Sequence, residues 1–191
     1  MSGAEGGGRV SGAEGGGRVS GAEGGGRVSG AEGGALTHLR ADGTATMVDV
    51  GGKDVTGRVA VAGCRVRMAP ATAALLAAGD LPKGDARSVA RIAGIQAAKR
   101  TSELLPLCHH VVLTSVDVDL EVDAEAGVAT ITATARAADR TGVEMEALVA
   151  CTTAALQLYD MVKAVQKDVV ITDVRLLRKE GGRSGSWVRA E

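Results

Sequence analysis

Aromatic residues are almost absent from this chain of 191 residues, which contains one Trp, one Tyr and no Phe. A hydrophobic core must therefore be built from Ala, Val, Leu and Ile, and abundant Ala favours helices that approach one another closely. The chain is long enough to bury such a core. Its length predicts one folded domain with an appendage.

Long apolar runs and paired cysteines are also missing. No stretch of about 20 apolar residues is present, so the sequence predicts no transmembrane helix. Cys64, Cys108 and Cys151 are odd in number and widely spaced, which argues against a disulfide framework and against a zinc-binding pattern. We expect reduced thiols and a location in the cytoplasm.

A nine-residue repeat occupies the start of the chain. The sequence Ser-Gly-Ala-Glu-Gly-Gly-Gly-Arg-Val occurs three times over residues 2–28 and breaks off within 29–34, and this region holds 15 of the 28 glycines. Its apolar side chains are too few to offset the entropy lost on ordering. We therefore expect residues 1–34 to form a disordered tail and residues 35–191 to form the folded domain.

The folded domain has no excess of either charge. The repeats carry three Arg and four Glu, and removing them from 22 basic and 23 acidic residues leaves 19 of each. A protein that binds duplex nucleic acid is expected to carry a basic surplus. The charge balance therefore argues against such a partner.

Hydrophobic periodicity predicts an α+β domain. Alternating segments predict strands over residues 46–50, 55–62 with a continuation to 68, 111–122, 128–137 and 169–177. Helical spacing predicts helices over residues 70–76, 86–103 and 140–165. Pro70 and Gly79 suit the two ends of the first helix, and Asp85 suits the start of the second. This order favours a ferredoxin-like layer, with helices packed on one face of a mainly antiparallel sheet and a flexible tail from residue 181.

The same spacing predicts which helix faces are buried. The apolar face of the second helix is expected to contain Val89, Ile92, Ala93, Gln96 and Ala97. That of the third is expected to contain Met145, Leu148, Val149, Thr152, Leu156, Tyr159 and Val162.

Charged residues gather at both ends of the third helix. Glu144 and Glu146 lie in its first turn, two residues apart, so their side chains diverge; Asp160 and Lys163 lie near its end and share a face. At 1.5 Å per residue, Glu144 and Lys163 are about 28 Å apart on a straight helix, too far for one small-molecule site. Either the helix breaks, or its ends serve different sites that partner chains complete.

Two adjacent histidines, His109 and His110, follow Leu107 and Cys108 at a junction between a helix and a strand. Imidazole is the natural proton carrier near neutral pH, and in an extended segment one ring would face a pocket and the other solvent. A pair of ordinary loop histidines is the alternative. For Cys108, a structural thiol is favoured over a nucleophile.

Basic residues supply candidates for anion binding, although most lysines and arginines are solvated surface cations. Lys83 is the most suggestive, because Gly84 and Asp85 follow it directly before a helix, whose N-terminus favours anions. The others are Arg58, Lys99, Arg100, Lys163, Lys179 and Arg183. These residues alone indicate acid–base and anion-binding groups but no particular reaction.

Nine segments occur in one order between residues 36 and 187. They are Leu36-Thr-His-Leu39, Met47-Val-Asp-Val50, Lys83-Gly-Asp85, Ala90-Arg-Ile-Ala-Gly-Ile-Gln-Ala-Ala-Lys-Arg-Thr101, Leu105-Pro-Leu-Cys-His109, Thr114-Ser-Val-Asp-Val118, Thr141-Gly-Val-Glu-Met-Glu-Ala-Leu148, Tyr159-Asp-Met-Val-Lys-Ala-Val165 and Gly181-Gly-Arg-Ser-Gly185. Together they resemble the MoaC family of molybdenum cofactor biosynthesis. The repeats lie outside this pattern, His110 replaces a usual proline, and Val162 stands where the family often has Cys.

The resemblance implies a ferredoxin-like lyase that uses general acid–base catalysis and no metal or cofactor. The implied reaction converts (8S)-3′,8-cyclo-7,8-dihydroguanosine 5′-triphosphate to cyclic pyranopterin monophosphate and diphosphate. The implied assembly is a homohexamer, a trimer of dimers, with active sites at subunit interfaces. Neither nucleic acid nor a membrane is expected as a partner.

The resemblance also implies roles for individual residues. Asp160 would be the principal acid–base group, Lys163 its charged partner and Lys83 a third catalytic residue. The implied substrate-binding residues are Arg58, Leu107, Cys108, His109, Glu144, Met145 and Glu146. Two alternatives stay open. One is a nucleotide-binding domain without catalysis, although the joint presence of Lys83, His109, Asp160 and Lys163 argues against it. The other is an acid–base enzyme that acts on another phosphorylated metabolite.

Overall fold

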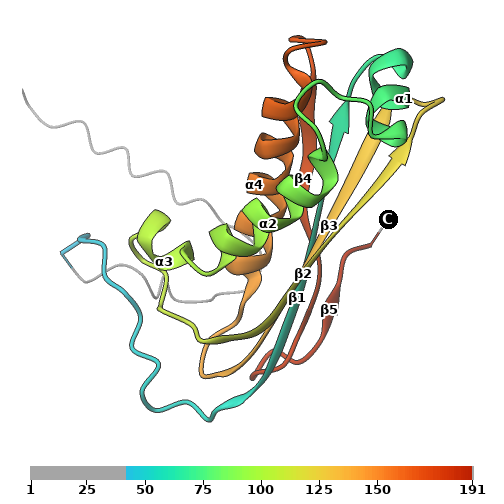
Figure 1. Ribbon diagram of the computed structural model, residues 1–191. Helices are drawn as coiled ribbons and strands as arrows, with labels where there is room; N and C mark the ends of the chain where they lie inside the picture. The colour runs from blue at the N-terminus through green and yellow to red at the C-terminus, as the bar shows by residue number, and fades with distance from the viewer. Residues whose placement is uncertain (1–41, 191) are drawn as a thin grey trace, which may run out of the picture. The chain divides into compact units, whose positions relative to one another are not determined.

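The computed structural model describes residues 42–190, and the predictions for the repeats and for the motif at residues 36–39 lie outside this range. The described chain contains a five-stranded sheet and helices packed on it (Figure 1). In chain order the elements are β1 (Thr56–Arg67), α1 (Pro70–Ala78), α2 (Ala86–Ala98), α3 (Thr101–Leu104), β2 (Leu113–Asp123), β3 (Val128–Asp139), α4 (Glu144–Val162), β4 (Val170–Glu180) and β5 (Trp187–Val188).

The sheet has the strand order β2-β3-β1-β4-β5, and every neighbouring pair is antiparallel. A strand, helices, a hairpin, a helix and a strand follow one another, with β1 and β3 at the centre, which is the ferredoxin-like arrangement. Figure 1 shows α2 and α4 side by side over one face of the sheet. The predicted α+β class is therefore confirmed.

Local signals for helix ends are also confirmed. Pro70 occupies the first turn of α1, and Gly79 ends that helix in the left-handed conformation, at φ 82°. Asp85 caps α2 by accepting a hydrogen bond from the backbone N–H of Ser88 at 3.0 Å. These short-range contacts depend only on neighbouring residues, so the sequence predicts them well.

The packing between the helices and the sheet is made largely of alanine. Ala147, Ala150 and Ala154 on α4 are completely buried, as are Ala133 and Ala135 on β3. On α2, a Cβ atom added at Gly94 would lie 2.8 Å from the carbonyl oxygen of Ala150. The two helices therefore approach so closely that only glycine fits at this crossing.

The predicted buried faces of α2 and α4 are confirmed at Ala97 and Val162, which are buried, but they are wrong at several larger aliphatic residues, for the same reason. Val89 and Ile92 on α2 are 40% and 56% exposed, and Met145 and Leu156 on α4 are 38% and 56% exposed. The buried residues of α2 are Ala97, as predicted, together with Ala86, Ala90, Gly94 and Ala98. Small side chains let the two helix backbones approach closely, and this buries more of the surface around them. Periodicity alone instead places the larger aliphatic residues on the buried face.

Other predicted elements also change, among them the helix over 140–165, which spans Glu144–Val162. Residues 46–50 form no strand, and the predicted helix over 86–103 is divided into α2 and α3. At this division the buried hydroxyl of Thr101 donates to the carbonyl oxygen of Ala98 at 3.0 Å, which satisfies the end of α2. The tail predicted from residue 181 adds β5 to the edge of β4.

Helix α4 is the element that decides how the site is built. It runs without a break from Glu144 to Val162, which excludes the predicted alternative of a broken helix. Its middle is held against β1 by Cys151, whose buried thiol donates to the free thiol of Cys64 at 3.0 Å. No helix within residues 42–190 combines the length and the apolar character needed to cross a membrane.

Candidate active site

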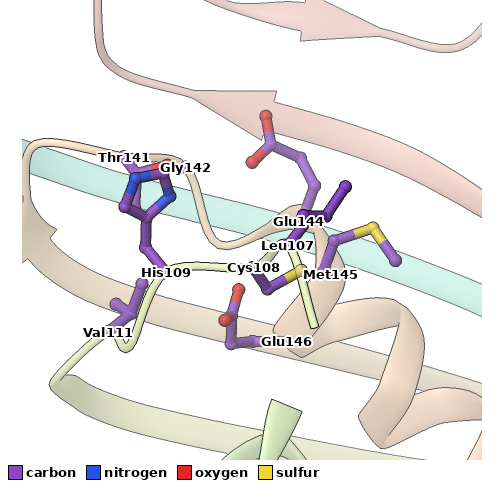
Figure 2. A pocket seen from close by; sticks show the side chains of 9 residues that line it. All are labelled: Leu107, Cys108, His109, Val111, Thr141, Gly142, Glu144, Met145 and Glu146. Atoms are coloured by element: carbon purple, nitrogen blue, oxygen red, sulfur yellow. The ribbon is translucent and has the colours of Figure 1, made fainter. Parts of the chain in front are cut away.

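A cavity of about 390 Å³ lies between the first turn of α4 and the segment that precedes β2 (Figure 2). It brings together six of the seven residues predicted to bind substrate, from two segments that are far apart in the sequence. Its lining consists of Leu107, Cys108, His109, Val111, Thr141, Gly142, Glu144, Met145 and Glu146. Val111, Thr141 and Gly142 were not predicted as site residues, although the last two belong to a segment that resembles the family.

His109 is oriented by a backbone contact. Its Nε2 atom lies 2.7 Å from the carbonyl oxygen of Val48. A carbonyl only accepts hydrogen bonds, so Nε2 carries a proton, and in the neutral ring Nδ1 is left as an acceptor. His110 is exposed and pairs with Ser102, so the two rings diverge as expected. The contact with Val48 was missed, because 61 residues separate the two positions.

Glu146 is the one buried charged residue of the described chain, with 4% of its surface exposed. Burial raises the pKa of its carboxyl above the ordinary value of 4.5, and the carboxylates of Glu144 and Asp139 raise it further. Burial, and then Glu146, also raise the pKa of the Cys108 thiol. Figure 2 shows the carboxyl groups of Glu144 and Glu146 pointing in different directions, as their spacing predicts. The cavity therefore contains a carboxyl that keeps its proton to a higher pH than an ordinary glutamate does.

Replacing Glu146 by Gln is expected to stabilise the protein at neutral pH. The raised pKa means that the folded state favours the protonated carboxyl, so its contribution is most favourable below pH 4.5 and is lost as the pH rises. We expect the melting temperature of the variant to exceed that of the wild type by about 2–4 °C at pH 7, the shift that about 1 kcal/mol produces at this size. Thermal denaturation between pH 4 and pH 8 measures it.

The matched control is Glu144→Gln. Glu144 is half-buried and pairs with Lys179 at 3.4 Å, so removing its charge should not raise the melting temperature by a comparable amount. The difference between Glu146→Gln and the wild type should shrink as the pH falls below 4.5. An equal or lower melting temperature for Glu146→Gln at pH 7 would show that burial of the charged Glu146 carboxylate does not destabilise the fold.

A second cavity, of about 510 Å³, adjoins the first and shares Thr141, Gly142 and Glu144 with it. It is lined by five cations and three carboxylates. The cations are Lys53, Arg58, Arg140, Lys179 and Arg183, and the carboxylates are Asp54, Glu144 and Glu180. Arg58 was predicted here, and Lys179 and Arg183 were anion-binding candidates. Lys53 and Arg140 were missed, because no local pattern marks them.

Hydrogen bonds to backbone carbonyls hold two of these cations. Arg58 donates from Nε to the carbonyl oxygen of Asp139 at 3.0 Å, and Arg140 donates from Nε to that of Lys53 at 2.9 Å. In both residues these bonds leave the terminal guanidinium nitrogens without a hydrogen-bond partner among the described residues. Free guanidinium donors at a basic cavity suit phosphate oxygens.

The three predicted catalytic residues form a cluster at the other end of α4. Asp160 forms an ion pair with Lys163 through Oδ1, at 2.6 Å, and accepts a hydrogen bond from Lys83 through Oδ2, at 2.8 Å. Lys83 also donates to the backbone carbonyl oxygen of Asp160 at 2.8 Å. Lys163, and then Lys83, lower the pKa of Asp160 to about 2, and Asp160 raises the pKa of Lys163. One ionised carboxylate therefore holds two ammonium groups side by side.

The cavities and the lysine cluster do not meet within one chain. Glu146 and Lys163 lie in the first turn and at the end of one continuous helix, about 25 Å apart at the usual rise. Among residues 42–190, no group of three or more His, Cys, Asp or Glu side chains is arranged to hold a metal ion. Each chain thus presents the predicted site residues in two separate places.

Comparison with known proteins identifies the family of this chain. The family model described as the MoaC family matches residues 47–182, which is well over half of the chain. The chain belongs to the MoaC family. The resemblance seen in nine segments is thereby confirmed, and the repeats lie outside the part that matches.

Three relatives illustrate the similarity. Cyclic pyranopterin monophosphate synthase of Roseiflexus sp. is 56% identical over 153 residues, which cover 80% of this chain and 97% of that protein. The protein of the same name from Chloroflexus aggregans is 54% identical over 156 residues, covering 82% and 94%. Cyclic pyranopterin monophosphate synthase 2 of Mycobacterium tuberculosis is 54% identical over 154 residues, covering 81% and 91%.

Proposed function

We propose that this MoaC family member is a lyase of molybdenum cofactor biosynthesis that converts (8S)-3′,8-cyclo-7,8-dihydroguanosine 5′-triphosphate to cyclic pyranopterin monophosphate and diphosphate. The main support is that the family's functional positions gather in two places on the fold. Six of them line one cavity, Arg58 lines the adjoining cationic cavity, and the remaining three form one cluster. The relatives' shared name points to the same reaction.

The two cavities suit the two halves of such a substrate. The second cavity offers guanidinium and ammonium groups, which make charge-assisted hydrogen bonds to phosphate oxygens. The first offers apolar contacts from Leu107, Val111 and Met145 beside the polar groups of His109 and Glu146, a combination that suits a purine-derived ring. Because the cavities adjoin, one molecule can occupy both.

Ring opening, rearrangement and formation of a cyclic phosphate require proton transfers. We assign proton acceptance to Nδ1 of His109 and proton donation to the carboxyl of Glu146, whose raised pKa keeps it protonated to higher pH. Asp160, with a pKa of about 2, is a weak base at neutral pH. We therefore assign to Asp160 the positioning of the ammonium groups of Lys83 and Lys163, in place of the role of principal acid–base group.

A complete site then requires two chains, with the cavities of one facing the lysine cluster of another. The exposed aliphatic side chains on α2 and α4, among them Val89, Ile92 and Leu156, offer apolar surface for a neighbouring copy. We retain the homohexamer, a trimer of dimers, as the proposed assembly, and the cytoplasm as the proposed location.

The decisive experiment supplies the purified cyclised nucleotide to the purified full-length protein. Formation of cyclic pyranopterin monophosphate together with an equal amount of diphosphate supports the proposal. Saturable binding without turnover would favour the nucleotide-binding alternative. Turnover of another phosphorylated metabolite, with none of the cyclised nucleotide, would favour the third possibility.

Deleting residues 2–34 is expected to leave turnover and oligomer size unchanged, within about twofold for kcat. The family match begins at residue 47, and every residue of the proposed site lies beyond the repeats. Steady-state kinetics and size-exclusion chromatography of the shortened and full-length chains provide the comparison. A clear loss of activity or a smaller assembly would show that the repeats contribute to one or the other.

A further inference from the structure

Arg58 lies against a pair of glycines from a distant segment. Gly181 and Gly182 follow β4 and have φ angles of 95° and 75°, a region that favours glycine. A Cβ atom added at Gly182 would overlap Nη1 of Arg58 and lie 2.9 Å from its Cζ atom. One added at Gly181 would lie 3.3 Å from Cδ of the same side chain. The arginine thus occupies space that any other residue at position 182 would fill.

The guanidinium of Arg58 is held from two sides. Its Nε atom donates to the carbonyl oxygen of Asp139 at 3.0 Å, and its outer part lies beside Gly182. Arg58 and Gly182 both line the second cavity. The backbone thereby fixes the stem and one edge of the guanidinium, while Nη1 and Nη2 have no hydrogen-bond partner among the described residues.

We propose that Gly182 is a positioning residue: it leaves the space in which Arg58 lies, and so directs the free guanidinium donors of Arg58 to a phosphate group of the substrate in the second cavity. This inference rests on the proposed function. A methyl group at position 182 forces the arginine into another rotamer, because the far end of a long side chain yields more easily than the backbone. The chain still folds, but the phosphate contact is lost.

Gly185 provides a matched control in the same loop. It too has a positive φ, at 63°, but an added Cβ would meet no atom within 4 Å, and it lines neither cavity. Gly182→Ala and Gly185→Ala therefore impose a comparable backbone strain, and only the first displaces Arg58. A difference between these variants reports the displacement rather than the strain.

The test measures the affinity of the full-length protein for inorganic triphosphate by isothermal titration calorimetry. We expect Gly182→Ala to weaken binding about 10–100-fold, as does Arg58→Ala, and Gly185→Ala to bind like the wild type. In the double variant Arg58→Ala with Gly182→Ala, binding should be no weaker than in Arg58→Ala alone, because the glycine acts only through the arginine.

The outcomes separate this inference from the proposed function. If the wild type does not bind triphosphate, the phosphate role of the second cavity fails, and the inference fails with it. If the wild type binds and Gly182→Ala binds equally well, only the inference is overturned; additive losses in the double variant also overturn it. Should Gly182→Ala fail to fold, the inference requires that Arg58→Ala restore folding in the double variant, since the collision is then gone, and a double variant that stays unfolded refutes it.

Discussion

Replacing Lys163 by Ala is expected to reduce kcat by on the order of 10³-fold while leaving a folded oligomer. Lys163 is half-exposed and contacts Asp160 at the end of α4, so its removal disturbs no core packing. Exposed ion pairs contribute little to stability, so the melting temperature should stay close to that of the wild type. The substitution removes one of the two ammonium groups that the Asp160 carboxylate holds, and the other, on Lys83, stays.

Asp160→Asn should have an effect of similar size, because the amide cannot hold two ammonium groups by charge. Lys167→Ala is the control: Lys167 is an exposed lysine just after the end of α4, and no hydrogen bond or ion pair of its side chain occurs among the described residues. Steady-state kinetics with the cyclised nucleotide, together with circular dichroism, measures both properties. Near-normal kcat in Lys163→Ala or Asp160→Asn would refute the catalytic assignment.

Mixing two inactive variants is expected to restore activity if the site is shared between chains. A Glu146→Gln chain keeps an intact lysine cluster, and a Lys163→Ala chain keeps intact cavities. After exchange of subunits in equal amounts, about a quarter of the sites should contain one intact Glu146 and one intact Lys163. The chain that supplies Glu146 and the chain that supplies Lys163 are each of the required type in about half of the cases. We therefore expect about a quarter of the wild-type activity.

The lysine cluster supplies a strict negative control for this experiment. Lys83 and Lys163 contact the same carboxylate of one chain, so a mixture of Lys83→Ala and Lys163→Ala chains contains no intact cluster. That mixture should stay inactive. If the mixture of Glu146→Gln and Lys163→Ala also stays inactive, although mass spectrometry demonstrates mixed oligomers, the site does not combine the two ends of α4 from different chains.

The proposed sharing of the site between chains is based on the geometry of a single helix. Within residues 42–190, α4 supplies Glu144 and Glu146 from its first turn and Asp160 from its last, and its length separates them by more than a small molecule spans. A straight helix is a rigid spacer, because each turn is fixed by backbone hydrogen bonds. For this chain, self-association would serve as a means of completing the site as well as a source of stability.

Much of the fold could be predicted from the sequence, because the signals are local. Alternation along β2 and β3, the proline and glycine at the ends of α1 and the cap at Asp85 each involve residues a few positions apart. The prediction failed where size mattered more than hydrophobicity. Val89 and Ile92 follow the periodicity of a buried face, yet the smaller side of α2, with Gly94, is the one that contacts α4.

The sequence by itself determined the class of fold, the family and the short segments that carry the candidate site, because each of these depends on residues that are close in the sequence. Only the tertiary structure decided which of these segments meet. It placed Val48 at His109, Lys83 at Asp160 and Gly182 at Arg58, across separations of 61 residues or more. Such contacts depend on the order of the strands and on the distance at which the helices pack. That distance is set by the volumes of side chains that meet in the fold but are far apart in the sequence.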